Sequence, residues 1–207
     1  MCRGALKMRP SLVFLLLLQN AAAQDPTAQF GTLYDALPST GGRIELSPGD
    51  PWLNTVGTFG VGSSKEIKKT IAVDCVTNSQ LKCVFDGENA RQLLQVTADD
   101  VSFSGIHFTR AHSETYGAAV TVISATGVSF TRCDFTHNTA ASSGAAVRMN
   151  VVGTVTFTLC SFTNNVARVG AAMYIYKGTN SGINIVIAGS YFHGNRATGA
   201  VSCILCI

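Results

Sequence analysis

Residues 128–147 read VSFTRCDFTHNTAASSGAAV, and two neighbouring segments nearly repeat them. Residues 101–120 read VSFSGIHFTRAHSETYGAAV, and residues 155–174 read VTFTLCSFTNNVARVGAAMY. The three segments start 27 residues apart. A fixed period of this length indicates stacked structural repeats rather than a conventional globular core.

Each repeat contains three short runs that alternate apolar and polar residues, as in VSFTR, CDFTHN and AAVRMNV of the middle repeat. Alternation with a period of two predicts strands with one buried face, and clusters of Asn, Gly, Ser and Thr between the runs predict turns. Three strands per repeat, each pairing with its equivalent in the next repeat at about 4.8 Å, predict an all-β parallel β-helix of about five coils. No helical periodicity is found after Gly41.

Equivalent residues of successive coils should form columns. We expect an inward phenylalanine stack and a ladder of side-chain amides at one turn, where the first repeat has Ala111 instead of Asn. The predicted core stack is Phe108, Phe135, Phe162 and Phe192, a second apolar column is Val101, Val128, Val155 and Ile185, and the amide ladder is Asn138, Asn165 and Asn195.

The N-terminus has the pattern of a secretory signal peptide. Basic residues precede the apolar run SLVFLLLL at positions 11–18, and small residues at 21–23 fit a cleavage site, so we expect a signal peptide over 1–23. An uncleaved anchor is the alternative. The rest of the sequence holds no apolar run of spanning length, which predicts a secreted or cell-surface protein without a membrane span after cleavage.

The repeat CDFTHNTAASSGAAVRM at 133–149 resembles those of polymorphic outer-membrane-protein-like β-helix proteins. FGTLYDALPSTGGRIELSPGD at 30–50 resembles the capping helix and first strand of the right-handed parallel β-helix (pectin lyase-like) superfamily, and CVFDGENARQLLQVTADDVSFSGIHFTR at 83–110 resembles an early coil. The resemblance covers residues 30–207. It implies a right-handed solenoid with a short N-terminal capping helix, and it is weak for any activity.

This resemblance divides the chain into an N-terminal cap with a first strand at 24–69 and β-helix coils at 70–207. The final residues AVSCILCI continue a strand, and no polar C-terminal cap follows in this sequence. An uncovered last coil is an exposed sheet edge, so we expect an incomplete product, another covering chain or self-association through this coil.

The enzymes of the superfamily need acidic groups that the coils largely lack. Polygalacturonase-like hydrolases need clustered aspartates, and pectate lyases need acidic calcium ligands and a base. Asp99 and Asp100 are the best local calcium candidates, with solvated turn residues as the alternative. His107 and Asp134 are predicted to be cross-strand neighbours rather than a catalytic pair. We therefore assign no catalytic and no metal-binding residue.

The sequence leaves open which cysteines form disulfides and which are free thiols. Cys75 and Cys83 flank a predicted turn, and a disulfide or two free thiols are both compatible with their spacing. Cys133 and Cys160 share an inward position in adjacent coils, where parallel Cβ vectors favour a buried thiol stack over a bridge. Cys203 and Cys206 lack a second ligand pair for zinc.

Charge and aromatic residues suggest where a ligand would bind. Residues 101–207 hold six basic and two acidic residues, too scattered for a nucleic-acid interface but able to favour an anionic polymer. The outer face of the third predicted strand carries Arg148 and Tyr174 in one column and Asn150 and Tyr176 in the next. These four are the candidate polysaccharide-binding residues, with ordinary β-propensity on a solvated face as the alternative.

Two functions remain open from the sequence. The first is a secreted, non-catalytic β-helix module for surface attachment, carbohydrate binding or structural assembly, with a polysaccharide or cell-surface glycan as partner. The alternative is a polysaccharide lyase, of the pectate lyase-like kind, or a glycoside hydrolase of the pectin lyase-like group acting on acidic polysaccharide. The shortage of acids in the coils favours the first.

Overall fold

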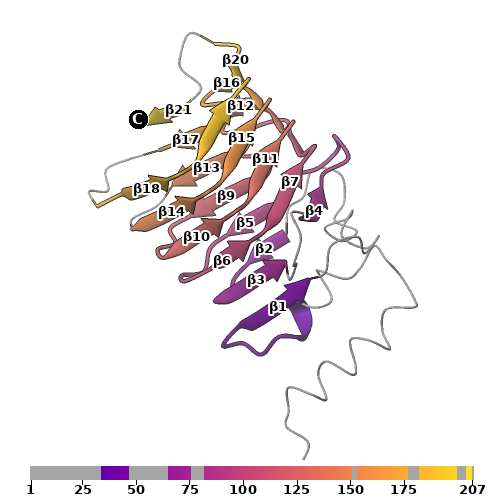
Figure 1. The fold of residues 1–207 in the computed structure, drawn as a ribbon, viewed down its shortest axis with the longest axis vertical. Coiled ribbons are helices and arrows are strands. Elements are labelled where there is room, and N and C mark those ends of the chain that lie inside the picture. Colours follow the sequence, from indigo (N-terminus) through magenta and orange to yellow (C-terminus); the bar gives the residue numbers. More distant parts are fainter. Residues whose placement is uncertain are drawn as a thin grey trace, which may run out of the picture.

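The computed structural model describes residues 34–46, 65–75, 82–150, 153–176, 182–199 and 204–206. The signal peptide predicted at 1–23 and Cys203 lie outside this part of the chain. The described residues form a parallel β-solenoid of about five coils, whose strands stack along one axis (Figure 1). A short helical piece at residues 34–36 precedes the first strand.

Four sheets enclose the core, and we number them in the order in which one coil passes through them. The first sheet contains β1 (Gly42–Leu46), β3 (Ile71–Cys75), β6 (Ser102–Ser104), β10 (Val128–Thr131), β14 (Thr154–Thr158) and β18 (Asn184–Ala188). The second sheet contains β4 (Cys83–Asp86), β7 (Ile106–Thr109), β11 (Asp134–Thr136), β15 (Ser161–Thr163) and β19 (Tyr191–His193).

The other two sheets complete the coils that begin with β6, β10, β14 and β18. The third sheet contains β8 (His112–Ser113), β12 (Thr139–Ser143), β16 (Val166–Val169) and β20 (Arg196–Ala197). The fourth sheet contains β2 (Lys65–Ile67), β5 (Leu94–Val96), β9 (Val120–Ile123), β13 (Val147–Asn150), β17 (Met173–Ile175) and β21 (Ile204–Cys206). The strands of the described residues pair in parallel, and β10 and β14 pair with Val128 opposite Val155, as the 27-residue period predicts.

The prediction of three strands per coil was wrong, because a short third sheet lies between the second and the fourth. Its longest strand, Thr139–Ser143, has the sequence TAASS, which is rich in residues typical of turns. Its pairing is irregular, with a register shift between Ala140 and Ser143. The strand that the sequence analysis counted third in each coil therefore belongs to the fourth sheet.

Two phenylalanine columns fill the core. In the second sheet, Phe135 stacks on Phe108 at 4.9 Å and on Phe162 at 4.7 Å between ring centroids, and Phe162 stacks on Phe192 at 4.7 Å. A parallel column in the first sheet, which the sequence analysis did not identify as a stack, contacts the first column edge to face. Its members are Phe103, Phe130 and Phe157.

The amide ladder lies at the corner between the second and third sheets. The Asn138 Oδ1 atom accepts a hydrogen bond from the Ala111 amide at 3.0 Å, so the ladder ends on the first repeat, which lacks an asparagine. Asn138 Nδ2 donates to Asn165 Oδ1 and Asn165 Nδ2 to Asn195 Oδ1, each at 2.9 Å. The left-handed backbone, with φ of 56° at His137, lies one residue before the ladder rather than on the asparagines.

Tyr34 and Leu37 cover the N-terminal end of the core. Tyr34 and Leu37 are buried and belong to the same hydrophobic core as the coils. The Tyr34 hydroxyl accepts a hydrogen bond from the Lys68 amide at 2.7 Å, which ties the helical piece to the strand β2. In the described residues, no helix is long and apolar enough to cross a membrane.

Candidate functional site

The outer face of the fourth sheet places the predicted binding residues next to one another. Arg148 on β13 lies opposite Thr121 on β9 and Tyr174 on β17, so these three residues form one column along the solenoid axis. Asn150 lies opposite Ile123 in the next column. Tyr176 follows β17, and its amide donates to the Met149 carbonyl at 2.8 Å, which keeps it beside β13.

The exposure of this column is uneven. Tyr176 is 42% exposed, whereas Arg148, Asn150 and Tyr174 are half-buried. Thr121, in the same column, is buried, and its Oγ1 atom donates to the Gly117 carbonyl at 3.4 Å. A ligand on this face would therefore contact Arg148 and the two tyrosines rather than Thr121.

Tyr116 is a part of the site that the sequence analysis missed. It lies in the corner before β9, the residue is 50% exposed, and its ring lies under the Arg148 guanidinium with 4.9 Å between Cζ and the ring centroid. A guanidinium on an aromatic face is held by a cation–π interaction, which restricts its orientation without neutralising its charge. The repeat pattern gave no signal for this contact, because Tyr116 belongs to a corner rather than to a strand.

The carboxylates of the coils after residue 100 are already paired. Asp134 forms an ion pair with Lys82, with 2.6 Å between Oδ1 and Nζ. Glu114 Oε1 lies 2.9 Å from His112 Nε2. In the described part of the chain, four arginines form no ion pair with a carboxylate. They are Arg132, Arg148, Arg168 and Arg196. These uncompensated cations favour an anionic partner.

His107 and Asp134 lie opposite each other in the second sheet, as expected, but their side chains have other partners. His107 Nε2 lies 2.7 Å from Thr136 Oγ1, and Asp134 pairs with Lys82. Burial lowers the pKa of His107 below its ordinary value of 6.5. The direct cross-strand contact that the sequence suggested is therefore replaced by two separate contacts.

Asp99 and Asp100 lie in the turn before the first-sheet strand β6. Asp99 Oδ1 accepts a hydrogen bond from the Thr126 amide at 2.8 Å, so this carboxylate ties one coil to the next. Asp100 has a left-handed backbone, with φ of 54°. Among the described residues, no three His, Cys, Asp or Glu side chains gather closely enough to hold a metal ion.

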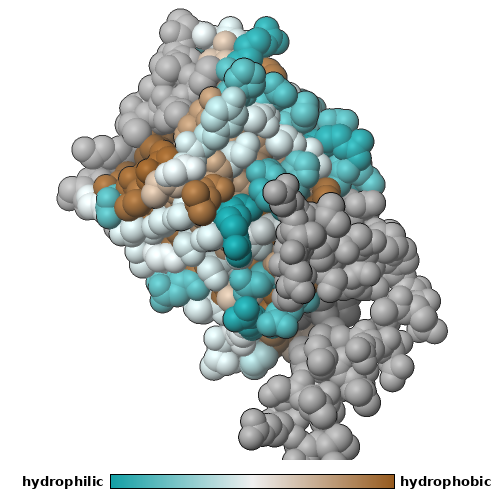
Figure 2. Space-filling view, in the orientation of Figure 1, coloured by the Kyte–Doolittle hydropathy of each residue, from teal (hydrophilic) through white to brown (hydrophobic). Residues whose placement is uncertain are grey.

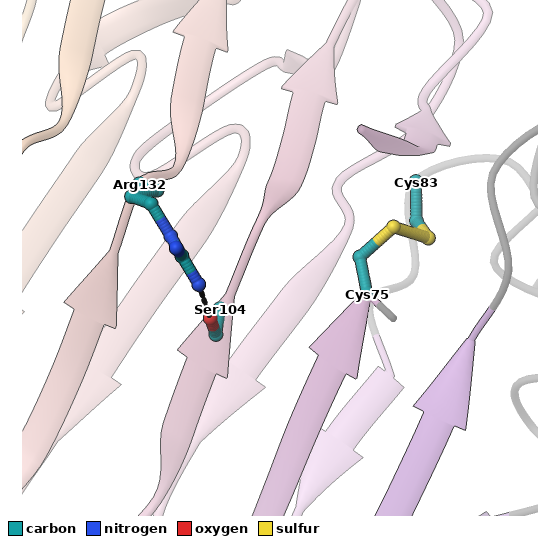
Figure 3. Close-up of a disulfide and its surroundings, with 4 residues drawn as sticks. All are labelled: Cys75, Cys83, Ser104 and Arg132. Carbon is teal, nitrogen blue, oxygen red and sulfur yellow. Dashed lines mark hydrogen bonds between the residues drawn. A yellow bond between two sulfur atoms is a disulfide. The ribbon is translucent and has the colours of Figure 1, made fainter. Parts of the chain in front are cut away.

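Cys75 and Cys83 form a disulfide at the corner between the first and second sheets (Figure 3). Their Cα atoms are 5.6 Å apart, and their sequence separation is 8. Other coils pass this corner in a shorter connection, as between Thr131 and Asp134, where Arg132 reaches the Ser104 hydroxyl at 3.5 Å. The disulfide thus closes the base of a longer connection.

We expect the double substitution Cys75→Ser, Cys83→Ser to lower the free energy of unfolding by about 2–3 kcal/mol. The reason is the loop-closure entropy that a short cross-link removes from the unfolded chain. Urea denaturation of the variant and of the wild type measures the difference, and the wild type with reductant should match the variant. Equal midpoints for all three samples would show that the cross-link does not contribute to stability.

Cys133 and Cys160 are free thiols inside the core, as the sequence analysis favoured. Each Sγ atom donates to equivalent carbonyls one coil apart, Cys133 to Phe103 O and Cys160 to Phe130 O. Burial raises the pKa of the Cys133 thiol well above its ordinary value, so this thiol stays protonated near neutral pH. The side chains of the predicted Cys203–Cys206 pair lie outside the described residues.

Comparison with known proteins adds no further information on this site. No protein-family model matches the chain, and neither a curated protein nor a solved structure matches it. The fold is therefore described as a parallel β-solenoid, and arguments about function rest on the residues themselves.

Proposed function

We propose that the protein is a secreted, non-catalytic module of the pectin lyase-like β-helix type that binds an acidic polysaccharide along its fourth sheet. The observation that carries this proposal is the guanidinium of Arg148, a residue that is half-buried. It rests on the ring of Tyr116, forms no ion pair within the described residues, and lies in register with Tyr174.

The chemistry of these side chains suits a sugar chain with acidic groups. Tyrosine rings offer apolar faces for stacking on sugar rings, while a guanidinium offers paired donors to a carboxylate or a sulfate ester. The column runs along the solenoid axis, so an extended chain could contact Tyr174, Arg148 and Tyr116 in turn. Asn150 and Tyr176 lie alongside and add an amide and a third ring.

The enzymatic alternative has less support. A glycoside hydrolase needs two carboxyl groups within roughly 5–10 Å across the scissile bond. In the described coils after residue 100, Asp134 lies on β11 of the second sheet and Glu114 follows β8 of the third sheet, and their carboxylates contact Lys82 and His112. Incubation of the protein with pectate and calcium tests this alternative, and the release of unsaturated oligosaccharides would overturn the non-catalytic proposal.

The binding experiment compares the wild type with the double variant Arg148→Ala, Tyr174→Ala on an immobilised acidic polysaccharide. We expect the variant to lose about tenfold or more in affinity, because a charge-assisted contact alone contributes about 1.5–3 kcal/mol. The matched control is Arg132→Ala, Tyr191→Ala, which removes the same two residue types from the first corner and the second sheet. Equal retention of all three proteins would exclude the fourth sheet as the binding face.

Structural assembly is a second candidate function, favoured by the last coil. Val186 and Ile187 on β18 and Tyr191 on β19 are 39%, 41% and 58% exposed. Figure 2 shows hydrophobic surface, in brown, at the position of β18. Both strands have one neighbour each within the described residues, β14 and β15. We propose that this face contacts a second copy of the chain.

The mass of the protein in solution tests this assembly. We expect the light-scattering mass of the 207-residue chain to rise with concentration, because an unpaired apolar edge favours association. Substitution of Val186 and Tyr191 by lysine should return the mass to that of a monomer. Lysine at Ser129, on the same first sheet but two coils away, is the control. A concentration-independent monomer for the wild type would rule the assembly out.

A further inference from the structure

The two ends of the solenoid differ at the two ends of one core column. Strands β1 and β18 lie at opposite ends of the first sheet (Figure 1). Ile44 on β1 and Ile187 on β18 are the end members of an inward column, of which Ile44 is 4% exposed and Ile187 is 41% exposed. The strand register connects them through Val73, Phe103, Phe130 and Phe157. Among the described residues, the core is therefore covered at the first end and open at the second.

The chain's own residues protect the first end against pairing with another strand. Leu37 lies against β1, where a Cβ atom added to Gly42 would be 3.0 Å from Leu37 Cδ2. On the same strand, Arg43 Nε lies 3.1 Å from Glu45 Oε1 and 3.3 Å from Asp74 Oδ2. Exposed charges and a covering segment are two of the features that keep edge strands from pairing.

The strands β18 and β19 at the second end carry none of these protective groups. Their sequences, NIVIA and YFH, contain no acidic residue, lysine, arginine or proline. Backbone groups of Asn184 and Ala188 hydrogen bond to the residues that flank β14. Because successive residues of a strand point their backbone groups to opposite sides, Ile185 and Ile187 direct theirs toward the other edge of β18. That edge has no partner strand among the described residues.

This difference between the ends decides how two copies of the chain can meet. Head-to-tail stacking gives an open filament, and it requires that β18 of one copy pairs with β1 of the next. Leu37 and the ion pairs of Arg43 oppose that contact. Two second ends, in contrast, are identical and unprotected, and their contact leaves no open end for a third copy.

We propose that two copies of the chain join through their second ends as a closed dimer, with a two-fold axis perpendicular to the solenoid axis. The axis reverses the strand direction, so β18 pairs antiparallel with β18 of the second copy. Val186 lies on the axis, which places Ile185 opposite Ile187 of the second copy. Both isoleucines face inward and direct backbone groups to the shared edge, so the core and the sheet continue from one copy into the other.

This inference rests on the assembly proposed above, to which it adds the orientation of the copies and the strand register. Sedimentation equilibrium of the wild type tests the closed arrangement. We expect the mass to rise to that of two chains and to remain there at higher concentration. A mass that stays at one chain would overturn the assembly and this inference with it. A mass that continues to rise beyond two chains would overturn the closed dimer and keep the assembly.

Cysteine substitutions on the outer face of the first sheet test the strand pairing, with oxidised glutathione as the oxidant. Val186→Cys should link most chains into dimers, because residues opposite each other in antiparallel strands have Cα atoms about 4.5–5.5 Å apart, within the range of a disulfide. Thr156→Cys, at the position paired with Val186 one coil earlier, is the matched control. Its two copies would lie three strand spacings apart, about 14 Å, and should not link.

A mixture of Asn184→Cys and Ala188→Cys chains, one of them isotope-labelled, tests the register. These positions lie opposite each other when Val186 is on the axis, so we expect links between unlike chains. Each variant alone should link little, because equal positions lie four residues apart along the strands, about 14 Å. Wild type measures any link through the chain's own cysteines. No more links in Val186→Cys than in Thr156→Cys and wild type would overturn the pairing, and no links between unlike chains would overturn the register.

Discussion

Phe135→Ala should lower the free energy of unfolding by about 3–5 kcal/mol, the cost of removing a buried aromatic ring and leaving a cavity. Phe135 is fully buried, and its ring stacks between those of Phe108 and Phe162. Phe130 contacts it edge to face, with 5.6 Å between centroids. Because the rings are held by strands in fixed register, the neighbours cannot collapse into the space without disturbing the sheet pairing.

Urea denaturation followed by circular dichroism measures this effect. Phe192→Ala is the matched control, since Phe192 is the same residue type in the same column but is only half-buried, with one stacked neighbour at 4.7 Å. We expect the control to lose clearly less than Phe135→Ala. A loss below about 1 kcal/mol for Phe135→Ala would contradict the role assigned to the stack.

The repeat period was enough to predict the fold because a parallel β-solenoid converts sequence spacing directly into contacts. Equal spacing of Phe108, Phe135 and Phe162 places these rings above one another, and the structure stacks them at 4.7–4.9 Å. The same argument applies to Asn138 and Asn165, which hydrogen bond in the ladder. Columns of equivalent residues are therefore predictable wherever the period is strict.

The third sheet could not be predicted, since the strand signal there is weak. Thr139–Ser143 alternates exposed and buried residues only in its first half, and its small polar residues are those expected in a turn. Its strand character comes from parallel neighbours on both sides rather than from local propensity. Tertiary pairing can impose strand structure on a segment whose own sequence favours a turn.

Partners of long polar side chains could not be predicted from register. Register predicted that Asp134 would contact His107, but Lys82, which comes before β4 two coils earlier, reaches the carboxylate at 2.6 Å. Likewise the partner of Arg148 is Tyr116, from the preceding corner. A flexible side chain can reach several residues, so spacing alone does not select its partner. The strand residues of the candidate site were thus predicted from the sequence, whereas its corner residue, Tyr116, was missed.

Asn165→Ala should lower the free energy of unfolding by about 3–4 kcal/mol, because several buried hydrogen bonds are lost together and each costs about 1–3 kcal/mol. Asn165 is fully buried. Its Nδ2 atom donates to the Phe135 carbonyl at 2.9 Å, and its Oδ1 atom accepts from the amide and the Nδ2 atom of Asn138 at 3.1 and 2.9 Å. Alanine supplies none of these groups, and because the position is fully buried, the donors and acceptors left behind are shielded from bulk solvent.

The matched control for this ladder position is the neighbouring asparagine. Asn164 is exposed and has a left-handed backbone, φ 55°, and the equivalent position of the next coil is Gly194, φ 62°. Asn164→Gly therefore removes an amide without strain at a site outside the ladder, and we expect a loss well below that of Asn165→Ala. Urea denaturation compares the two, and hydrogen exchange should be faster at the Asn138 amide in Asn165→Ala alone. Equal stability of the two variants, with unchanged exchange at Asn138, would show that the amide ladder does not hold the coils together.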